Sequence, residues 1–225
     1  MIKGLSVLFA GAAMVGFSNW ANAAATLTVY DGVNPLITVF DNGPGDQFPI
    51  TGEILVQTNV GVWNLDINVA VTKPLFGSTT QPVMDLSASA SSTAAGSLRL
   101  VFSDNGFGPA TGTLNATETG HVDGGAPVNM TYNVYGDPAN VVGATTVLIA
   151  GLGTTAFPTS EAASGLLALP TPFSLTQVVD FVAYGPTTIS SDASFNVTVP
   201  EPGVLGFWGL GMVVCALARL QRRRA

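Results

Sequence analysis

Cysteine is almost absent from this sequence: the 225-residue chain has a single one, Cys215, close to its C-terminus. Residues 24–199 therefore contain no disulfide, even in an oxidising compartment. Histidine is equally scarce, with His121 as the sole example. One histidine without cysteine excludes a zinc site of ordinary composition from this region. A Ser-His-Asp arrangement around His121 stays formally open, but no G-x-S-x-G motif supports it.

Positive charge is the second shortage. Residues 24–199 have two basic residues, Lys73 and Arg99, against thirteen acidic ones, which is a net charge of −11. A surface of this sign repels phosphate backbones and anionic lipids, so we expect no nucleic-acid partner. Glycosidases work with paired carboxylates, but no pair of acids is marked out by its surroundings. We therefore expect no catalytic residues and a non-enzymatic protein.

Helical periodicity is nearly absent as well, and short strands of alternating polarity take its place. The clearest strand puts Trp63, Leu65, Ile67, Val69 and Val71 on one face, with polar residues between most of them. This spacing favours core packing for Trp63 over exposure for sugar stacking. Further predicted strands cover residues 27–30, 36–40, 53–60, 98–103, 111–117, 128–134, 145–150, 175–184 and 194–199.

Turns rich in Asp, Asn and Gly separate these strands. The pattern predicts an all-β fold, a β-sandwich of the jelly-roll or Greek-key type over residues 24–199. Two segments deviate from the alternation. Residues 87–97 are small and polar, which predicts a mobile loop or a weak edge strand. Residues 160–169 are the one place where a short helix is expected.

Two loops carry residues that calcium prefers as ligands. Asp41 and Asp46 bracket an Asn-Gly-Pro-Gly turn, and Asp104 begins an Asp-Asn-Gly turn. Carboxylate and amide oxygens suit calcium, yet neither loop has the EF-hand spacing. Ordinary hairpin turns need the same residue types. Calcium at Asp41, Asp46 and Asp104 therefore stays open, and no other cofactor is expected.

The N-terminus has the three parts of a secretory signal. Lys3 supplies the positive charge, residues 5–17 form an apolar stretch, and Ala21-Asn22-Ala23 is a small-x-small cleavage site. We expect residues 1–23 to be a signal peptide, read by the secretion machinery and cut by signal peptidase. The mature chain then begins at Ala24.

The C-terminus has an equally clear order of parts. Val199 leads into Pro200, Glu201 and Pro202, where the two prolines impose an extended spacer. Residues 203–218 are uncharged, and extension to residue 220 lets Arg219 reach the headgroups, so a transmembrane helix is predicted over 203–220. Positive charge after such a span keeps the C-terminus on the cytoplasmic side of the membrane. The basic residues concerned are Arg219, Arg222, Arg223 and Arg224.

This order of Pro-Glu-Pro, short apolar helix and arginines resembles the PEP-CTERM sorting signal of exported bacterial proteins, here over residues 200–225. Residues 172–179, with 72–74 and 82–86, are also similar to stretches of one PEP-CTERM group. The resemblance implies an exosortase as partner, with cleavage near Pro200, Glu201 and Pro202. It also implies a transient stay in the inner membrane facing the periplasm, followed by transfer to the cell surface or extracellular matrix.

We therefore expect an exported surface or matrix protein, associated with the exopolysaccharide of a biofilm. A carbohydrate- or calcium-binding β-sandwich module is the first alternative, and a hydrolase is the second. Three Asn-x-Thr triplets are weak glycosylation signals in a bacterial protein. They begin at Asn115, Asn129 and Asn196.

Overall fold

Every regular element that the structure describes is a β-strand. The structure, a computed structural model, describes residues 25–199. The predicted signal peptide with its cleavage site at Ala21 to Ala24, and the predicted sorting signal over residues 200–225, lie outside them. The strands are β1 (Thr26–Tyr30), β2 (Ile37–Phe40), β3 (Glu53–Val60), β4 (Trp63–Val71), β5 (Val83–Ser92), β6 (Gly96–Phe107), β7 (Thr111–Gly125), β8 (Val128–Asp137), β9 (Val147–Ala156), β10 (Thr159–Ala168), β11 (Phe173–Ala183) and β12 (Thr187–Thr198).

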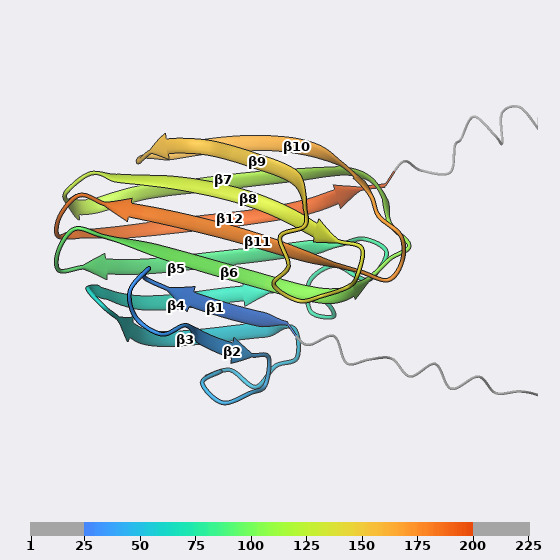
Figure 1. The fold of residues 1–225 in the computed structure, drawn as a ribbon, viewed down its shortest axis with the longest axis horizontal. Helices are drawn as coiled ribbons and strands as arrows, with labels where there is room; N and C mark the ends of the chain where they lie inside the picture. Colours follow the sequence, from blue (N-terminus) through green and yellow to red (C-terminus); the bar gives the residue numbers. More distant parts are fainter. Residues whose placement is uncertain (1–24, 200–225) are drawn as a thin grey trace, which may run out of the picture.

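Two six-stranded antiparallel sheets face each other (Figure 1). Sheet A has the order β2-β1-β6-β11-β8-β9, and sheet B has the order β10-β7-β12-β5-β4-β3. Strands β5 to β12 alone follow the jelly-roll order, with β5-β12-β7-β10 opposite β6-β11-β8-β9. The first four strands then extend both sheets on one side. The predicted all-β sandwich is thus confirmed.

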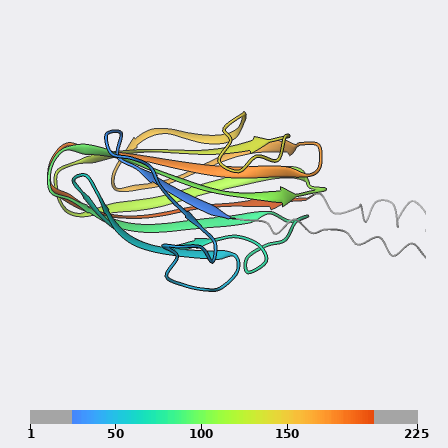
Figure 2. The ribbon, with the colours of Figure 1, turned by 60° about the horizontal axis from the view of Figure 1, so that its bottom comes forward.

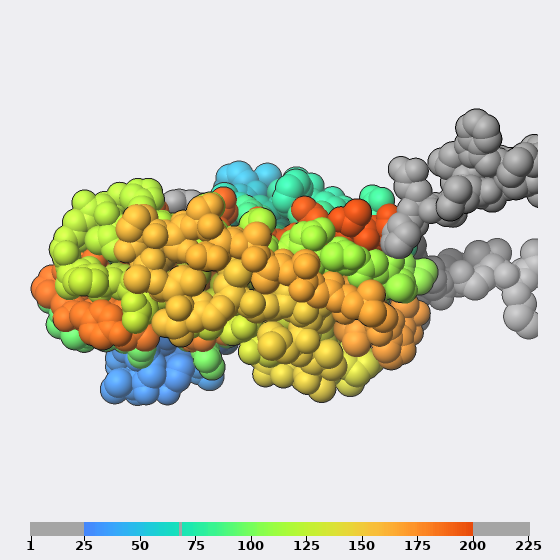
Figure 3. All heavy atoms as spheres, turned by 90° about the horizontal axis from the view of Figure 1, so that it is seen from above, coloured from blue at the N-terminus to red at the C-terminus, as the bar shows by residue number. Residues whose placement is uncertain are grey.

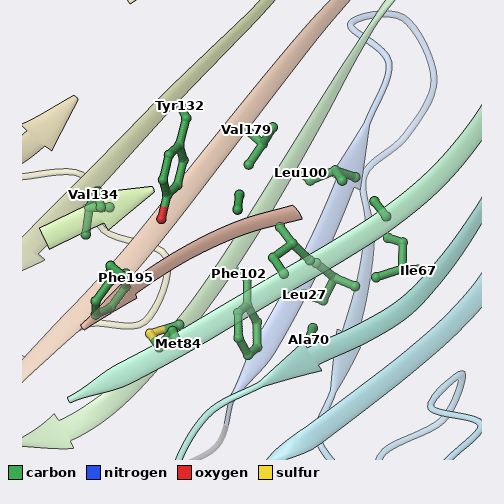
Figure 4. Packing of buried hydrophobic residues seen from close by; sticks show 14 of the residues in the cluster. Leu27, Ile67, Ala70, Met84, Leu100, Phe102, Tyr132, Val134, Val179 and Phe195 are labelled. Atoms are coloured by element: carbon green, nitrogen blue, oxygen red, sulfur yellow. The ribbon is translucent and has the colours of Figure 1, made fainter. Parts of the chain in front are cut away.

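The core lies between the inner faces, where every second residue of most strands is buried. Figure 4 shows side chains of both sheets meeting there, among them Phe102 and Tyr132 from sheet A and Phe195 from sheet B. Trp63 is 1% exposed, and its indole Nε1 donates to the carbonyl of Ser97 at 2.8 Å. The prediction that Trp63 packs in the core is therefore confirmed.

Two sequence-based expectations are wrong. The segment expected to be a short helix is mostly β10, which pairs with β7 over its whole length. Most of the segment expected to be a loop or weak edge belongs to β5, which pairs with β4 on one side and β12 on the other. Its Ala88 and Ala90 fill the core face while serines face outward. Small residues have little preference of their own for strand or loop. Hydrogen bonding to strands that are distant in the sequence therefore determines the secondary structure of such segments.

A β-bulge changes the face that β4 presents. The register with β5 shifts between Asp66 and Val69, and the register with β3 shifts at the same place. Beyond the bulge Ala70 is fully buried, whereas Val69 is only half-buried. The expectation that Val69 and Val71 share the core face of Trp63 is therefore wrong, because one extra residue reverses the alternation.

The two ends of the sandwich carry different loops. β1 begins and β12 ends at the same end (Figure 1), which also carries the loops at 41–52, 72–82 and 138–146. The opposite end carries the β1–β2 loop at 31–36. Among residues 25–199, the structure contains no helix with the length and hydrophobicity of a membrane span.

Candidate functional site

The outer face of sheet A carries a row of polar and aromatic side chains across four strands. Tyr30 of β1 is paired with Arg99 of β6, Arg99 with Asp180 of β11, and Asp180 with Thr131 of β8. Directly paired residues point to the same side of a sheet. Their strand neighbours Val29, Leu98, Leu100 and Phe181 are buried inside, so this row faces outward. Three strand spacings make it about 14 Å wide.

Arg99 and Asp180 form the centre of this row. The guanidinium donates from Nε to Oδ1 at 2.7 Å and from Nη2 to Oδ2 at 3.0 Å, a bidentate pair. The hydrogen bond with Asp180 raises the pKa of Arg99 further, and Tyr135 contributes in the same direction. The arginine side chain is 55% exposed. Its remaining N–H donors therefore stay available to a ligand, while the pairing fixes the plane of the group.

A second row runs beside the first, from Thr28 through Val101 and Val178 to Asn133. Tyr135 follows two residues along β8, on the same face and half-buried. We call the surface made by these two rows with Tyr135 the sheet A platform. At its centre lie Val101, which is half-buried, and Val178, which is only 4% exposed, and hydroxyl, amide, carboxylate and guanidinium groups surround them.

Loops at both ends border the sheet A platform. Ser103 and Thr176, on the next row, are fully buried because the β8–β9 loop covers them. The amide of Gly143 in that loop donates to the Ser103 hydroxyl at 2.9 Å. Figure 2 shows this yellow loop and the blue β1–β2 loop rising on the same side of the sandwich. Figure 3 shows both segments projecting from one edge of the molecule, with a recess between them.

This arrangement has the chemistry that binds sugar rings. A sugar presents apolar C–H faces and a rim of hydroxyl groups. Tyrosine rings such as Tyr30 and Tyr135 pack on the faces and keep a polar hydroxyl. Bidentate groups such as Arg99 and Asp180 bond two neighbouring hydroxyls in a defined direction. A wide, shallow face accommodates a chain rather than a single small molecule.

The outer face of sheet B is polar but has a different character. Serines of β5 and β12 alternate there with two close carboxylates, Asp85 and Asp192. Burial first, and then Asp192, raise the pKa of Asp85 to about 7. Asp192 also accepts from the Ser87 hydroxyl at 3.0 Å. Asp85 therefore holds a proton up to near neutral pH, which relieves its repulsion with Asp192.

The structure also brings a serine, a histidine and an aspartate together on this face. His121 Nε2 lies 2.7 Å from Asp123 Oδ1, and the Ser190 hydroxyl lies 3.1 Å from His121 Nδ1. His121 and Ser190 border a shallow hollow of about 390 Å³. However, β12 is paired on both sides, so the backbone N–H groups around Ser190 serve the sheet. An oxyanion hole needs free N–H donors at that point.

The three calcium candidates come near one another, but their oxygens have protein partners. Asp46 accepts from the amides of residues 42, 48 and 55, and Asp41 accepts from the amide of Gly52. Burial raises the pKa of Asp41, helped by Asp46 and Asp104. Asp104 Oδ2 lies 2.7 Å from the Lys73 ammonium. The ammonium group therefore occupies the place beside this carboxylate where a calcium ion would bind. Within residues 25–199, no three acidic, histidine or cysteine side chains gather as metal ligands.

The sheet A platform was not foreseen from the sequence. Arg99 and Asp180 are 81 positions apart, and only the pairing of β6 with β11 joins them. One local signal did exist. Tyr30 and Tyr135 occupy the alternate positions that are otherwise polar in their strands. These positions face away from the core, so an aromatic residue there is not needed for core packing. The other expected site residues, Pro200 to Pro202 and the four arginines from Arg219 on, lie outside the described residues.

Neither protein-family models nor curated proteins match this chain. Solved structures with similar folds include TmCBM61 in complex with beta-1,4-galactotriose, at 10% identity and a TM-score of 0.34, covering 60% of this chain and 86% of that one. A xylan-binding domain from CBM 22 is 11% identical at a TM-score of 0.29, over 69% and 96% of the two chains. The enzymatically active domain of a bacteriophage CBA120 tailspike protein is 12% identical at 0.36, over 70% and 21%. At these TM-scores the similarities say nothing about what this chain binds.

Proposed function

We propose that this protein is an exported, non-enzymatic β-sandwich that binds a neutral polysaccharide on the sheet A platform. The observation that carries the proposal is the outward row Tyr30, Arg99, Asp180 and Thr131, crossing four strands between two raised loops. The excess of thirteen carboxylates over two cations disfavours a polyanionic chain. A neutral polymer with repeating hydroxyl groups fits both the charge and the shape.

The ends of the sequence support delivery to the outside of the cell. The signal at residues 1–23 directs export, and the resemblance of residues 200–225 to a PEP-CTERM signal supports sorting by an exosortase at Pro200-Glu201-Pro202. The β-sandwich then functions at the cell surface or in a biofilm matrix. Its role is to hold exopolysaccharide rather than to cut it.

Affinity electrophoresis tests the binding directly. The mature chain is run in native gels that contain increasing amounts of neutral exopolysaccharide from the producing organism. We expect its migration to slow as the polymer concentration rises. Arg99→Met and Tyr135→Ala should each weaken binding about tenfold, which corresponds to about 1.4 kcal/mol. Unchanged binding in both variants would place the site elsewhere.

A matched control uses the opposite face. Ser87 and Ser190 lie on the outer face of sheet B and are remote from the platform. Ser87→Ala and Ser190→Ala should bind as the wild type does. Equal losses from variants of both faces would indicate a general loss of folding, which circular dichroism of each variant detects.

A hydrolase is the second candidate, because His121, Asp123 and Ser190 come within hydrogen-bonding distance. A fluorophosphonate probe labels serines that are activated as nucleophiles. We expect no labelling, since His121 and Asp123 are exposed and no free backbone donors surround Ser190. Labelling that disappears in Ser190→Ala would instead establish the hydrolase.

A further inference from the structure

Large apolar side chains are exposed on two loops at one end of the sandwich. Phe48 and Ile50 lie in the β2–β3 loop, and Leu75 and Phe76 lie in the β4–β5 loop. Their exposed fractions are between 41% and 51%. Contiguous apolar groups on the surface of a soluble domain mark a place of contact. We call these four residues the apolar foot.

The two loops of the apolar foot touch each other and the end of the last strand. The amide of Thr72 donates to the carbonyl of Gly52 at 2.8 Å, joining the β4–β5 loop to the β2–β3 loop. The amide of Val197 donates to the carbonyl of Pro82 at 3.1 Å, joining the β4–β5 loop to β12. The foot therefore adjoins the point where the described chain ends, at Val199.

A buried ion pair anchors the β4–β5 loop. Lys73 donates to Asp104 Oδ2 at 2.7 Å and lies over the ring of Phe107, 4.1 Å from its centroid. Leu75 and Phe76 follow directly, and the Phe76 amide donates to the carbonyl of Thr72 at 2.9 Å. The exposed side chains of Leu75 and Phe76 thus lie on a loop that is held in place.

The sequence brings an apolar segment close to this foot. Its first residue, Gly203, is four positions after Val199. Four extended residues span at most about 14 Å. If residues 203–220 cross the inner membrane, as the proposed sorting function requires, Val199 is held within that distance of the bilayer surface, and the foot lies at the same end of the sandwich.

We propose that the apolar foot rests on the lipid surface while the protein is still anchored, and so fixes the orientation of the sandwich. This inference rests on the proposed sorting function. Aromatic side chains favour the interface between headgroups and acyl chains. Residues 24–199 carry a net negative charge, so we expect the foot to contact a zwitterionic lipid surface rather than an anionic one. The sheet A platform lies on the outer face of its sheet, away from this end, and stays open to solvent.

A fluorescent probe at single cysteines tests this contact. The chain from residue 24 to 225 is reconstituted in phosphatidylcholine vesicles containing doxyl-labelled lipid, and nitrobenzoxadiazole is attached to one cysteine at a time. Phe76→Cys and Val33→Cys are made in a Cys215→Ser background. Val33 is 87% exposed at the opposite end and serves as the matched control. The native Cys215, in the predicted span, reports insertion of the tail.

We expect quenching at Cys215 and at position 76, with position 76 quenched at least about threefold more than position 33. Quenching at Cys215 with equal, weak quenching at positions 76 and 33 would overturn the contact and leave the anchor standing. No quenching at Cys215 would overturn the proposed anchor, and the foot contact with it. A blue-shifted but unquenched probe at position 76, growing with protein concentration, would show a second copy on the foot and overturn the lipid contact.

Ile50→Cys provides a second reading of the same surface. In a Leu75→Ser, Phe76→Ser background its quenching should fall at least about twofold, while circular dichroism stays that of the wild type. Unchanged quenching would mean that Leu75 and Phe76 do not hold the domain on the lipid.

Discussion

At the scale of single residues, one buried carboxylate sets how stability depends on pH. Glu118 of β7 points into the sandwich, is fully buried, and has one oxygen, Oε2, without a hydrogen bond. Its other oxygen accepts from the Ser191 hydroxyl at 3.3 Å. Burial raises the pKa of Glu118 to about 7, and Asp192 and Glu161 add to the effect. A neutral acid is tolerated in this position, but an ionised one is costly.

Glu118→Gln should therefore stabilise the protein at alkaline pH. The pKa of Glu118 is higher in the folded protein than the value of 4.5 that applies to the unfolded chain. Its contribution to the free energy of unfolding is therefore fully present below pH 4.5 and is lost as the pH rises through 7. Chemical denaturation at pH 5 and pH 8 should show a gain of about 2 kcal/mol for the variant at pH 8 only. Asp123→Asn, at an exposed carboxylate, is the control and should show no such gain. A variant less stable than the wild type at pH 8 would contradict this account.

Trp63 is the largest buried side chain of the core, and the sequence pattern predicts its position there. It is almost fully buried, and its indole N–H bonds the carbonyl of Ser97. Trp63→Ala should reduce the free energy of unfolding by about 3–5 kcal/mol in urea titrations, through the cavity and the unpaired carbonyl. Tyr184→Ala, at an exposed ring, should change it by less than about 0.5 kcal/mol. A cost below about 1 kcal/mol at Trp63 would place the ring outside the core.

At the scale of elements, a buried ion pair joins the two sheets where β4 leaves sheet B. Lys73 and Thr72 both donate to Asp104 Oδ2 of β6, at 2.7 and 2.8 Å. Burial lowers the pKa of Lys73, and Asp104 opposes this shift. The pair is close to neutral in net stability, but either partner alone is expensive to bury. Its structural effect is to hold the β4–β5 loop against sheet A.

Asp104→Ala should destabilise the protein by about 3–5 kcal/mol, because it leaves the Lys73 ammonium buried without its carboxylate. The double variant Lys73→Met, Asp104→Leu should recover most of that loss, since no charge stays buried. Thermal unfolding of the wild type, of Lys73→Met and Asp104→Leu alone, and of the double variant provides the cycle. Additive losses in the double variant would show that the two side chains do not depend on each other.

At the scale of the whole molecule, the jelly roll places the two proposed functional surfaces on different sides. β1 begins and β12 ends at the end that carries the apolar foot, while the sheet A platform lies along the flank. A tail that leaves next to the foot can be held at a membrane without covering the platform. The proposed binding surface and the proposed sorting signal would thereby be separated in space.

Replacement of Pro200-Glu201-Pro202 by three alanines should stop processing. Without the prolines the predicted helix could continue through the site, and the groups that the exosortase is expected to recognise would be lost. In a host with an exosortase, we expect the variant to accumulate in the inner membrane, larger than the released wild type by about the mass of the tail on immunoblots. Replacement of Arg222 to Arg224 by serine should weaken the retention of the protein in the inner membrane and the orientation of its predicted span. Efficient release of the triple-alanine protein would identify an ordinary anchor.

Local chemistry in the sequence determined the class of fold but not the pairing of its strands. Alternation such as Val128 to Val134, and turns rich in Asp and Gly, are local, so strands and the core position of Trp63 were predictable. The absence of disulfides and the acidic charge follow from composition alone. The tertiary structure alone decided that residues 159–168 form a strand, that the bulge in β4 reverses its faces, and that Arg99 meets Asp180. These features depend on hydrogen bonds between distant segments, whose partners no local pattern specifies.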